Sequence, residues 1–152
     1  MPTTDVELII HSLHRNVLST TWVQRPIETD CEFDRFPSRP GTYRCTVTYD
    51  GIELPFQVRI GVITRDGRRS LTYKVIPEKT VLTKKAVLGE FWRGGTTMGY
   101  TEMRCDDDIP AREVVELGPT PYSCYYKTKG SKDARYYHLA RVHVTENGLE
   151  IH

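Results

Sequence analysis

The sequence predicts an α+β fold built of two tandem units, each with an N-terminal helix packed on an antiparallel β-meander. Three observations favour it: four cysteines that fall into two pairs, a weak repeat around these pairs, and in each half a helical pattern followed by alternating strand patterns. We expect the first unit to span residues 1–76, with Cys31 and Cys45, and the second residues 77–152, with Cys105 and Cys124. Pro77 marks the boundary, because proline disfavours continuation of a strand or a helix.

Length and composition are those of an ordinary globular chain. It has 152 residues, 38% of them hydrophobic and 27% charged, with 21 Lys and Arg against 20 Asp and Glu. This composition excludes collagen, coiled coil and wholesale disorder. A net charge of +1 argues against phosphate neutralisation as the main task. No apolar run reaches the ~20 residues of a membrane span, and the first residues lack the pattern of a signal peptide, so we expect no membrane span.

The repeat is centred on the second cysteine of each pair. A tyrosine lies two residues before that cysteine and a glycine six residues after it, as Tyr43, Cys45 and Gly51 and again as Tyr122, Cys124 and Gly130. Further along, Asp66-Gly67 and Asn147-Gly148 each follow an apolar residue, a threonine and a charged residue. Both dipeptides tolerate the positive φ of a type I′ turn and predict hairpins. We interpret these matches as a duplication; two unrelated halves of one domain are the alternative.

In the first half, a helix and three strands are expected in order. Residues 4–7 have the pattern of a capping box, in which the Thr4 hydroxyl and the Glu7 carboxylate satisfy exposed backbone amides. Alternating apolar residues predict strands over residues 43–49, 56–62 and 71–75. The helix is expected from the helical spacing of Val6, Ile9, Ile10, Leu13 and Val17.

The second half predicts the same order of elements. A helix is expected over residues 80–92, and Gly94-Gly95 would end it because glycine is typical of helix C-termini. Strands are expected over residues 122–127 and 136–145, the second leading into the turn at Asn147-Gly148. The apolar positions of the expected helix are Val81, Leu82, Leu88, Phe91 and Trp92.

The cysteines are expected to pair within each half, as Cys31–Cys45 and Cys105–Cys124 disulfides. Each lies in or beside a strand pattern, where an inert thiol or a bridge is more common than an activated nucleophile. Each bridge would stabilise a small unit by ~3 kcal/mol and would indicate an oxidising compartment. The alternative is four reduced cysteines that serve as small core residues in a cytosolic protein.

Metal, cofactor and catalytic chemistry have no strong candidate in the sequence. His11 and His14 lie three residues apart without a carboxylate at a metalloprotease position, so we expect them on an exposed helix surface. Residues 106–108 are three consecutive aspartates without the spacing or glycine turn of a calcium loop, and we expect a solvated charge run. Gly94-Gly95 follows a predicted helix, whereas phosphate-binding glycine loops precede one. We therefore expect no metal site, no cofactor and no enzymatic activity.

Aromatic and basic residues concentrate in the second half and indicate a surface that contacts a partner. Tyr and Arg supply much of the contact energy at protein interfaces, and Tyr can also stack on bases. Arg65 and Arg68 flank the turn at Asp66-Gly67 and would form a protruding basic loop. The alternative is that alternate tyrosines fill the core while the cations face solvent. In the second half, the residues expected at the partner surface are Tyr125, Tyr137, Lys127, Arg135 and Arg141.

A motif around Cys45 in the first half resembles that of a known group of domains. After Cys31 the chain runs Pro40-Gly41-Thr42-Tyr43-Arg44-Cys45-Thr46-Val47-Thr48-Tyr49-Asp50-Gly51, with Val58-Arg59-Ile60 and Asp66-Gly67 behind it. This resembles the small two-cysteine domains of unknown function in bacterial secreted proteins and lipoproteins, which place a helix before a cysteine-paired antiparallel sheet with a G-x-x-x-C-T-V/L-x-x-D-G signature. The resemblance covers about residues 5–75.

The second half matches this pattern only through Cys105, Tyr122, Cys124 and Gly130. The tandem layout also looks like that of the β-lactamase inhibitory proteins, by architecture alone, which says nothing about the same target. Neither resemblance implies a catalytic residue.

The function expected from the sequence is a non-enzymatic binding or inhibitory module, extracytoplasmic or secreted, that recognises a protein through an exposed sheet face and loops. Nucleic acid is a possible but less favoured partner, because the net charge is near zero. The alternative is a phage-borne or intracellular protein with reduced cysteines, cytoplasmic or in a virion. It would be a structural part of the virion, or would bind a host factor or nucleic acid.

Overall fold

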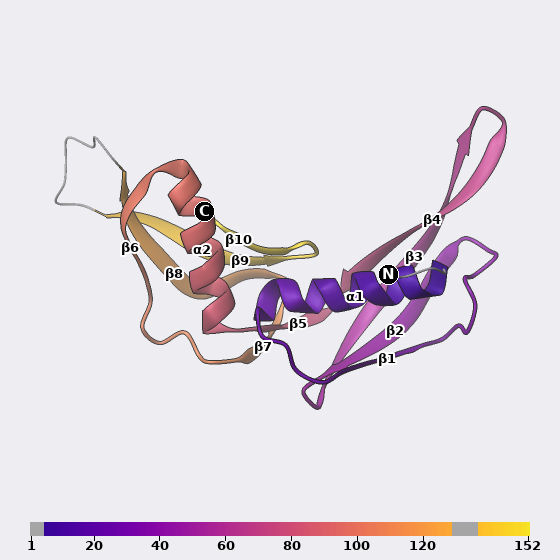
Figure 1. Ribbon diagram of the computed structural model, residues 1–152, viewed down its shortest axis with the longest axis horizontal. Helices are drawn as coiled ribbons and strands as arrows, with labels where there is room; N and C mark the ends of the chain where they lie inside the picture. The colour runs from indigo at the N-terminus through magenta and orange to yellow at the C-terminus, as the bar shows by residue number, and fades with distance from the viewer. Residues whose placement is uncertain (1–4, 129–136) are drawn as a thin grey trace.

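The computed structural model describes residues 5–128 and 137–152, which form two helices and ten strands in antiparallel sheets (Figure 1). The predicted α+β class is confirmed. Neither helix of the described residues is long and apolar enough to cross a membrane. The elements are α1 Asp5–Thr21, β1 Ile27–Cys31, β2 Gly41–Tyr49, β3 Ile52–Arg65, β4 Arg68–Pro77, β5 Lys79–Leu82, α2 Lys84–Met98, β6 Tyr100–Cys105, β7 Glu113–Glu116, β8 Gly118–Thr128, β9 His138–Thr145 and β10 Gly148–Ile151.

The two larger sheets have the same layout along the chain. The first follows α1 and has the order β1-β2-β3-β4; the second follows α2 and has the order β10-β9-β8-β6. Each sheet is therefore a four-stranded antiparallel meander preceded by a helix. A small third sheet pairs β5, which links the two halves, with β7, which interrupts the second meander. Figure 1 shows the two sheets at opposite ends of an elongated molecule.

Helix α1 packs its apolar stripe on the first sheet. Ile9, Leu13 and Val17 are fully buried and join a core with inward residues of β2 and β3, such as Val47 and Phe56. The predicted helix is confirmed, because three residues at i, i+4 and i+8 lie on one face. Thr4 of the expected capping box lies outside the described residues.

The strand alternation of the first half is confirmed along β2 and along β3 as far as Ile60, whereas Val62 and Leu71 of the expected strands are exposed. Along β2, Cys45, Val47 and Tyr49 are buried while the residues between them are not. The β3–β4 hairpin turns at Asp66-Gly67, where φ is 52° and 75°, as a type I′ turn requires. Beyond Ile60 this hairpin leaves the core and extends into solvent.

The predicted second helix has wrong bounds. The residues at 79–82 form β5 and pair with β7, so the apolar Val81 and Leu82 are buried in a strand. Helix α2 begins after Thr83, whose side chain accepts a hydrogen bond from the Ala86 N–H.

The expected end of this helix is also wrong. Gly95 lies inside α2, where a Cβ would come within 2.2 Å of the Met103 side chain, and the helix ends at Gly99, with φ 78°. Leu88 and Trp92, expected on the apolar face, are exposed, whereas Val87 and Phe91 are buried.

The second sheet forms the hairpin expected near Asn147, with a shifted turn. Gly148 pairs with Thr145, so the two turn residues are Glu146 and Asn147 rather than Asn147 and Gly148. Strand β9 begins at His138, and Tyr136 of the expected strand lies outside the described residues. Tyr122, Cys124 and Val142 face α2 and form a second core with Phe91.

The two halves are joined by hydrogen bonds from the end of α1 to β5 and to Thr83, the N-cap of α2. The Thr83 hydroxyl donates to the Thr21 carbonyl over 2.6 Å, and the Thr20 and Thr80 hydroxyls lie 2.9 Å apart. Neighbouring residues of β5 divide between the cores, Val81 in the first and Leu82 in the second. The halves therefore share a continuous packed junction.

His14 gives a testable pH dependence. Its imidazole lies 2.7 Å from the Thr29 hydroxyl, so it is not simply an exposed surface histidine as expected. Burial, and secondarily the charge of His11, lower the pKa of His14 below the ordinary 6.5. Above 6.5 both the folded and unfolded chains hold it neutral; as the pH falls through 6.5 the unfolded chain takes up the proton first, so the free energy of unfolding decreases down to the folded pKa.

We expect His14→Gln to remove this part of the pH dependence while keeping a polar group near Thr29. Urea unfolding of both proteins, above and about one pH unit below the ordinary pKa of histidine, measures it. Parallel stability curves for the two proteins would contradict the prediction.

Candidate functional site

Both expected disulfides are present, and they occupy the same place in the two sheets. Cys31 and Cys45 are direct partners across β1 and β2, and Cys105 and Cys124 are direct partners across β6 and β8. The Cα atoms are 4.0 Å and 3.8 Å apart. Each bridge thus joins the first and second strands of its meander. All four cysteines are used in these two bridges.

The two bridges also have the same pair of hydrogen bonds beside them. In the first sheet the Glu32 N–H donates to the Arg44 carbonyl, and the Glu32 carboxylate accepts from the Arg44 N–H. In the second, the Asp106 N–H donates to the Ser123 carbonyl, and the Asp106 carboxylate accepts from the Ser123 N–H. In both sheets, therefore, the acidic residue directly after the first cysteine forms hydrogen bonds with the backbone of the residue directly before the second cysteine.

Asp106 also corrects an expectation. Asp107 and Asp108 are exposed, as a solvated run predicts, but Asp106 is half-buried and serves two donors. Its second oxygen accepts from the Tyr125 hydroxyl over 2.9 Å. This hydrogen bond, with desolvation as the second cause, raises the pKa of Tyr125 above its ordinary value of 10.0.

The outer face of the second sheet, turned away from α2, gathers rings and cations. The Arg104 guanidinium lies 5.1 Å from the rings of both Tyr125 and Tyr137, and the Lys127 ammonium lies 4.7 Å from the Tyr137 ring. These distances allow cation–π attraction. Lys127 is also paired with Glu102 at 3.0 Å.

This surface, which we call the Tyr125 face, extends onto β9. Leu139 is the strand partner of Tyr125 and is 58% exposed, while Tyr137 is 40% exposed. Arg141, the partner of Ser123, alternates with the buried Ala140 and Val142 and so points outward. The Tyr125 face consists of Arg104, Tyr125, Lys127, Tyr137, Leu139 and Arg141.

Other tyrosines of the second half fill the core, as the alternative sequence interpretation predicts. Tyr122 is 9% exposed. Its hydroxyl donates to Glu113, and this bond together with burial raises the pKa of Tyr122 to about 12. Tyr126 stacks on Tyr100, with ring centroids 3.8 Å apart. Alternation along β8 thus sends Tyr122 and Tyr126 inward and Tyr125 outward.

The remaining expected contact residues are not all on this face. Arg65 and Arg68 end the β3–β4 hairpin of the first sheet, at the opposite end of the molecule in Figure 1. Arg135 lies outside the described residues. Sequence reasoning missed Arg104 and Leu139, whose positions depend on strand register.

The corresponding outer face of the first sheet has different chemistry. Thr46 directly follows Cys45 as Tyr125 directly follows Cys124, and both point away from the helix. A shallow depression on the first face is lined by Glu28, Asp30, Thr48 and neighbouring polar residues. Aromatic rings and cations therefore distinguish the second outer face from the first.

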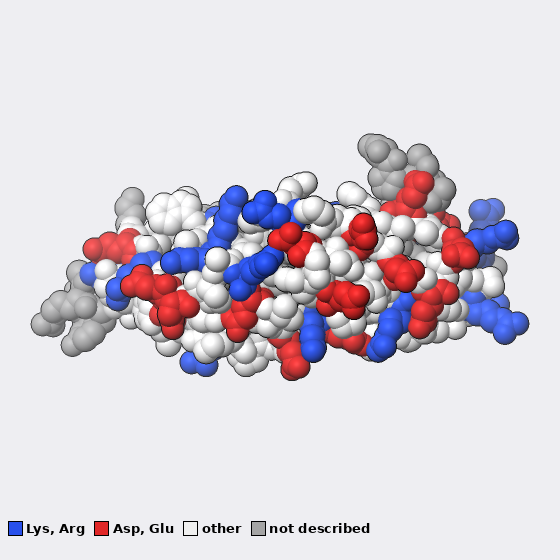
Figure 2. Space-filling view, turned by 90° about the horizontal axis from the view of Figure 1, so that it is seen from below, with Lys and Arg blue, Asp and Glu red and all other residues white. Residues whose placement is uncertain are grey.

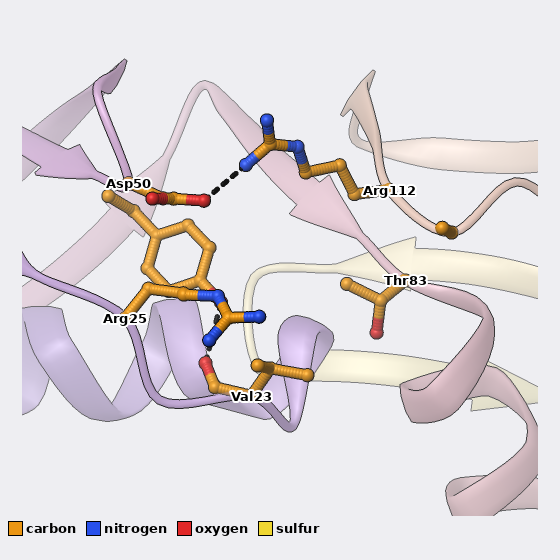
Figure 3. Close-up of a pocket in the computed structure, with 7 residues that line it drawn as sticks. Val23, Arg25, Asp50, Thr83 and Arg112 are labelled. Carbon is orange, nitrogen blue, oxygen red and sulfur yellow. Dashed lines mark hydrogen bonds and ion pairs between the residues drawn. The ribbon is translucent and has the colours of Figure 1, made fainter.

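A cavity of about 310 Å³ lies at the junction of the two halves (Figure 3). Arg112, before β7, reaches across it to an ion pair with Asp50 in the β2–β3 turn, and Arg25 enters from the loop after α1. The Tyr49 hydroxyl donates to the Val23 carbonyl along one wall. The Arg112–Asp50 ion pair connects the two halves across the cavity. Among the residues that line the cavity, no nucleophile lies beside a base.

Within residues 5–128 and 137–152, no group of three or more His, Cys, Asp or Glu side chains could hold a metal ion. Comparison with protein-family models, with curated proteins and with solved structures found no match.

Proposed function

We propose that this chain is a non-enzymatic binding module that recognises an acidic patch on a protein partner through the Tyr125 face. The observation that carries the proposal is the stack of Tyr125, Arg104, Tyr137 and Lys127, held by Asp106 and Glu102 before any partner arrives. Ordered aromatic and arginine side chains lose little conformational entropy on binding and supply large contact areas.

The chemistry of the face supports an acidic partner. The Arg104 guanidinium lies 5.1 Å from both ring centroids, and the N–H groups of a guanidinium can bind a carboxylate in bidentate fashion. Arg141 adds positive charge on one side, and the exposed Leu139 adds apolar contact. Acidic side chains flanked by an apolar residue would satisfy both features.

Two further proposals concern origin and location. The shared strand order, bridge position and clamping hydrogen bonds support two related units over residues 1–76 and 77–152 and kinship with the two-cysteine secreted domains. The two disulfides are compatible with an extracytoplasmic location. A nucleic-acid partner is the second candidate, because the same rings could stack on bases.

The test replaces Tyr125 with the residue that the first sheet carries at the same position. We expect Tyr125→Thr to weaken binding of acidic peptides, selected from a random library on the wild-type chain, at least about tenfold, because the ring and its contact with Arg104 are lost. Titration calorimetry measures the affinity.

Thr46→Ala, on the outer face of the first sheet, is the matched control and should bind like wild type. Selected peptides that carry no acidic residues, or that bind equally to Tyr125→Thr, would contradict the proposal. Tight, salt-sensitive binding of single-stranded DNA that is lost in Tyr125→Thr would move the assignment to nucleic acid.

A further inference from the structure

The starting point is a contact between the two halves. The turn of the β9–β10 hairpin lies against α1 and β4 of the first half, as Figure 1 shows. The Asn16 side-chain amide donates to the Glu146 carbonyl over 2.7 Å, and Lys74 pairs with the Glu146 carboxylate at 2.6 Å. Gly148 is so close to Ser19 that a Cβ would lie 3.0 Å from the Ser19 hydroxyl. A hairpin of the third and fourth strands thus docks between the helix and the fourth strand of the other half.

The equivalent groove of the second half, between α2 and β10, is open. It has a volume of about 350 Å³ and is largely apolar, with Phe91 and Gly94 from the helix and Leu149 and Ile151 from the strand. Met98 at its rim is 69% exposed. Glycine at position 94 leaves room, since nothing lies within 4 Å of where its Cβ would be.

The equivalent hairpin of the first half, β3–β4, projects freely. It carries three exposed branched residues, Val62 (36%), Ile63 (40%) and Leu71 (38%). Its type I′ tip is flanked by Arg65 and Arg68, and the outermost side chains at this end of the molecule in Figure 2 are basic. Figure 1 shows that the hairpin points away from α2 and β10, so it cannot fill the groove of its own chain.

We propose that the β3–β4 hairpin of one copy docks in the α2–β10 groove of a second copy. The second copy is favoured as occupant because the chain already docks one such hairpin, through the polar groups of its turn, between a helix and the fourth strand of the other half. The second hairpin and the second groove have the same places in the topology, but they lie too far apart to meet within one chain. Apolar side chains are present on both sides: Val62, Ile63 and Leu71 on the hairpin, and Phe91, Leu149 and Ile151 in the groove. Because the two surfaces differ, the contact is heterologous and builds head-to-tail chains or closed rings.

Analytical ultracentrifugation of three proteins tests the proposal. Wild type should increase in mass with concentration, beyond the dimer. Gly94→Lys, which fills the groove, and Ile63→Lys/Leu71→Lys, which charges the hairpin, should each stay monomeric, with dissociation constants at least about tenfold higher. An equimolar mixture of the two variants should form a dimer and stop there, because one intact hairpin meets one intact groove.

Thr96→Lys adds the same charge to α2 at an exposed position outside the groove and should assemble like wild type. Met98→Lys and Val62→Lys replace any variant whose circular dichroism shows misfolding. A wild type that stays monomeric, or variants that do not complement, would overturn the proposal. Binding of a monomeric wild type to vesicles of anionic phospholipid would assign the basic hairpin to a lipid surface instead and would also overturn it. The Tyr125 face is not involved, so its own test stands apart.

Discussion

Replacing Cys105 and Cys124 together with alanine is expected to lower the free energy of unfolding by about 3 kcal/mol. The bridge closes a segment with a sequence separation of 19 and fastens β6 to β8. Strand β6 lies at the edge of its sheet, and its pairing with β8 is interrupted between Thr101 and Arg104, where Glu102 has a positive φ of 49°. The bridge therefore fixes the register of the two strands on the side of this interruption where Cys105 faces Cys124.

Urea unfolding of the oxidised proteins, with intact mass confirming the remaining bridge, measures the loss. The matched variant, Cys31→Ala with Cys45→Ala, should lose a similar amount, smaller by a few tenths of a kcal/mol because its sequence separation is 14. The variants also bear on the candidate site, since Arg104 reaches Tyr125 from β6. An unchanged urea midpoint for the Cys105 and Cys124 variant would show that the bridge adds nothing to the strand pairing.

Local patterns were sufficient where each residue's environment is set by its near neighbours. The spacing of Ile9, Leu13 and Val17 identified α1, and alternation identified β2 and the core part of β3. The cysteine pairs could be predicted because an antiparallel meander brings successive strands side by side. The turn at Asp66-Gly67 depends on two residues that favour positive φ.

The start and end of α2 could not be predicted because distant contacts determine them. Val81 and Leu82 have apolar side chains compatible with a helix, but they pair with β7, more than thirty residues later. Gly95 is a common helix-ending residue, yet here it is placed inside the helix by its close approach to Met103 and Tyr100. Tertiary packing overrides local propensity in both places.

The part of the candidate site that lies on one strand could be predicted, because the alternation of side chains along that strand decides which residues face outward. Tyr125 and Lys127 lie two residues apart in β8 and therefore on the same, outer face of the sheet, as the alternation in the sequence predicts. Arg104 enters the cluster from β6, where the irregularity near Glu102 changes which residues face outward, and no pattern within β6 reveals it. Leu139 resembles a core residue until the pairing of β8 with β9 places it opposite Tyr125.

Phe56→Ala is expected to cost about 3–5 kcal/mol, the largest effect of any single substitution considered, because it empties the centre of the first core. Phe56 is fully buried and lies across the sheet from Cys45 on one side and Pro77 on the other. Val62→Thr, three alternate positions further along β3 and 36% exposed, is the control and should change stability by less than about 0.5 kcal/mol.

The same variant tests whether the halves unfold together. Three features couple the two halves. Thr83 forms a hydrogen bond with the end of α1, and the residues of β5 divide between the two cores. In addition, the Trp22 ring packs so closely on Gly89 that it leaves no room for a Cβ there. We therefore expect Phe56→Ala to reduce hydrogen-exchange protection in β8 and β9 by the same free energy as in β2 and β3. Protection that persists in β8 and β9 would mean that the second half folds without the first, and that the junction transmits little of the loss.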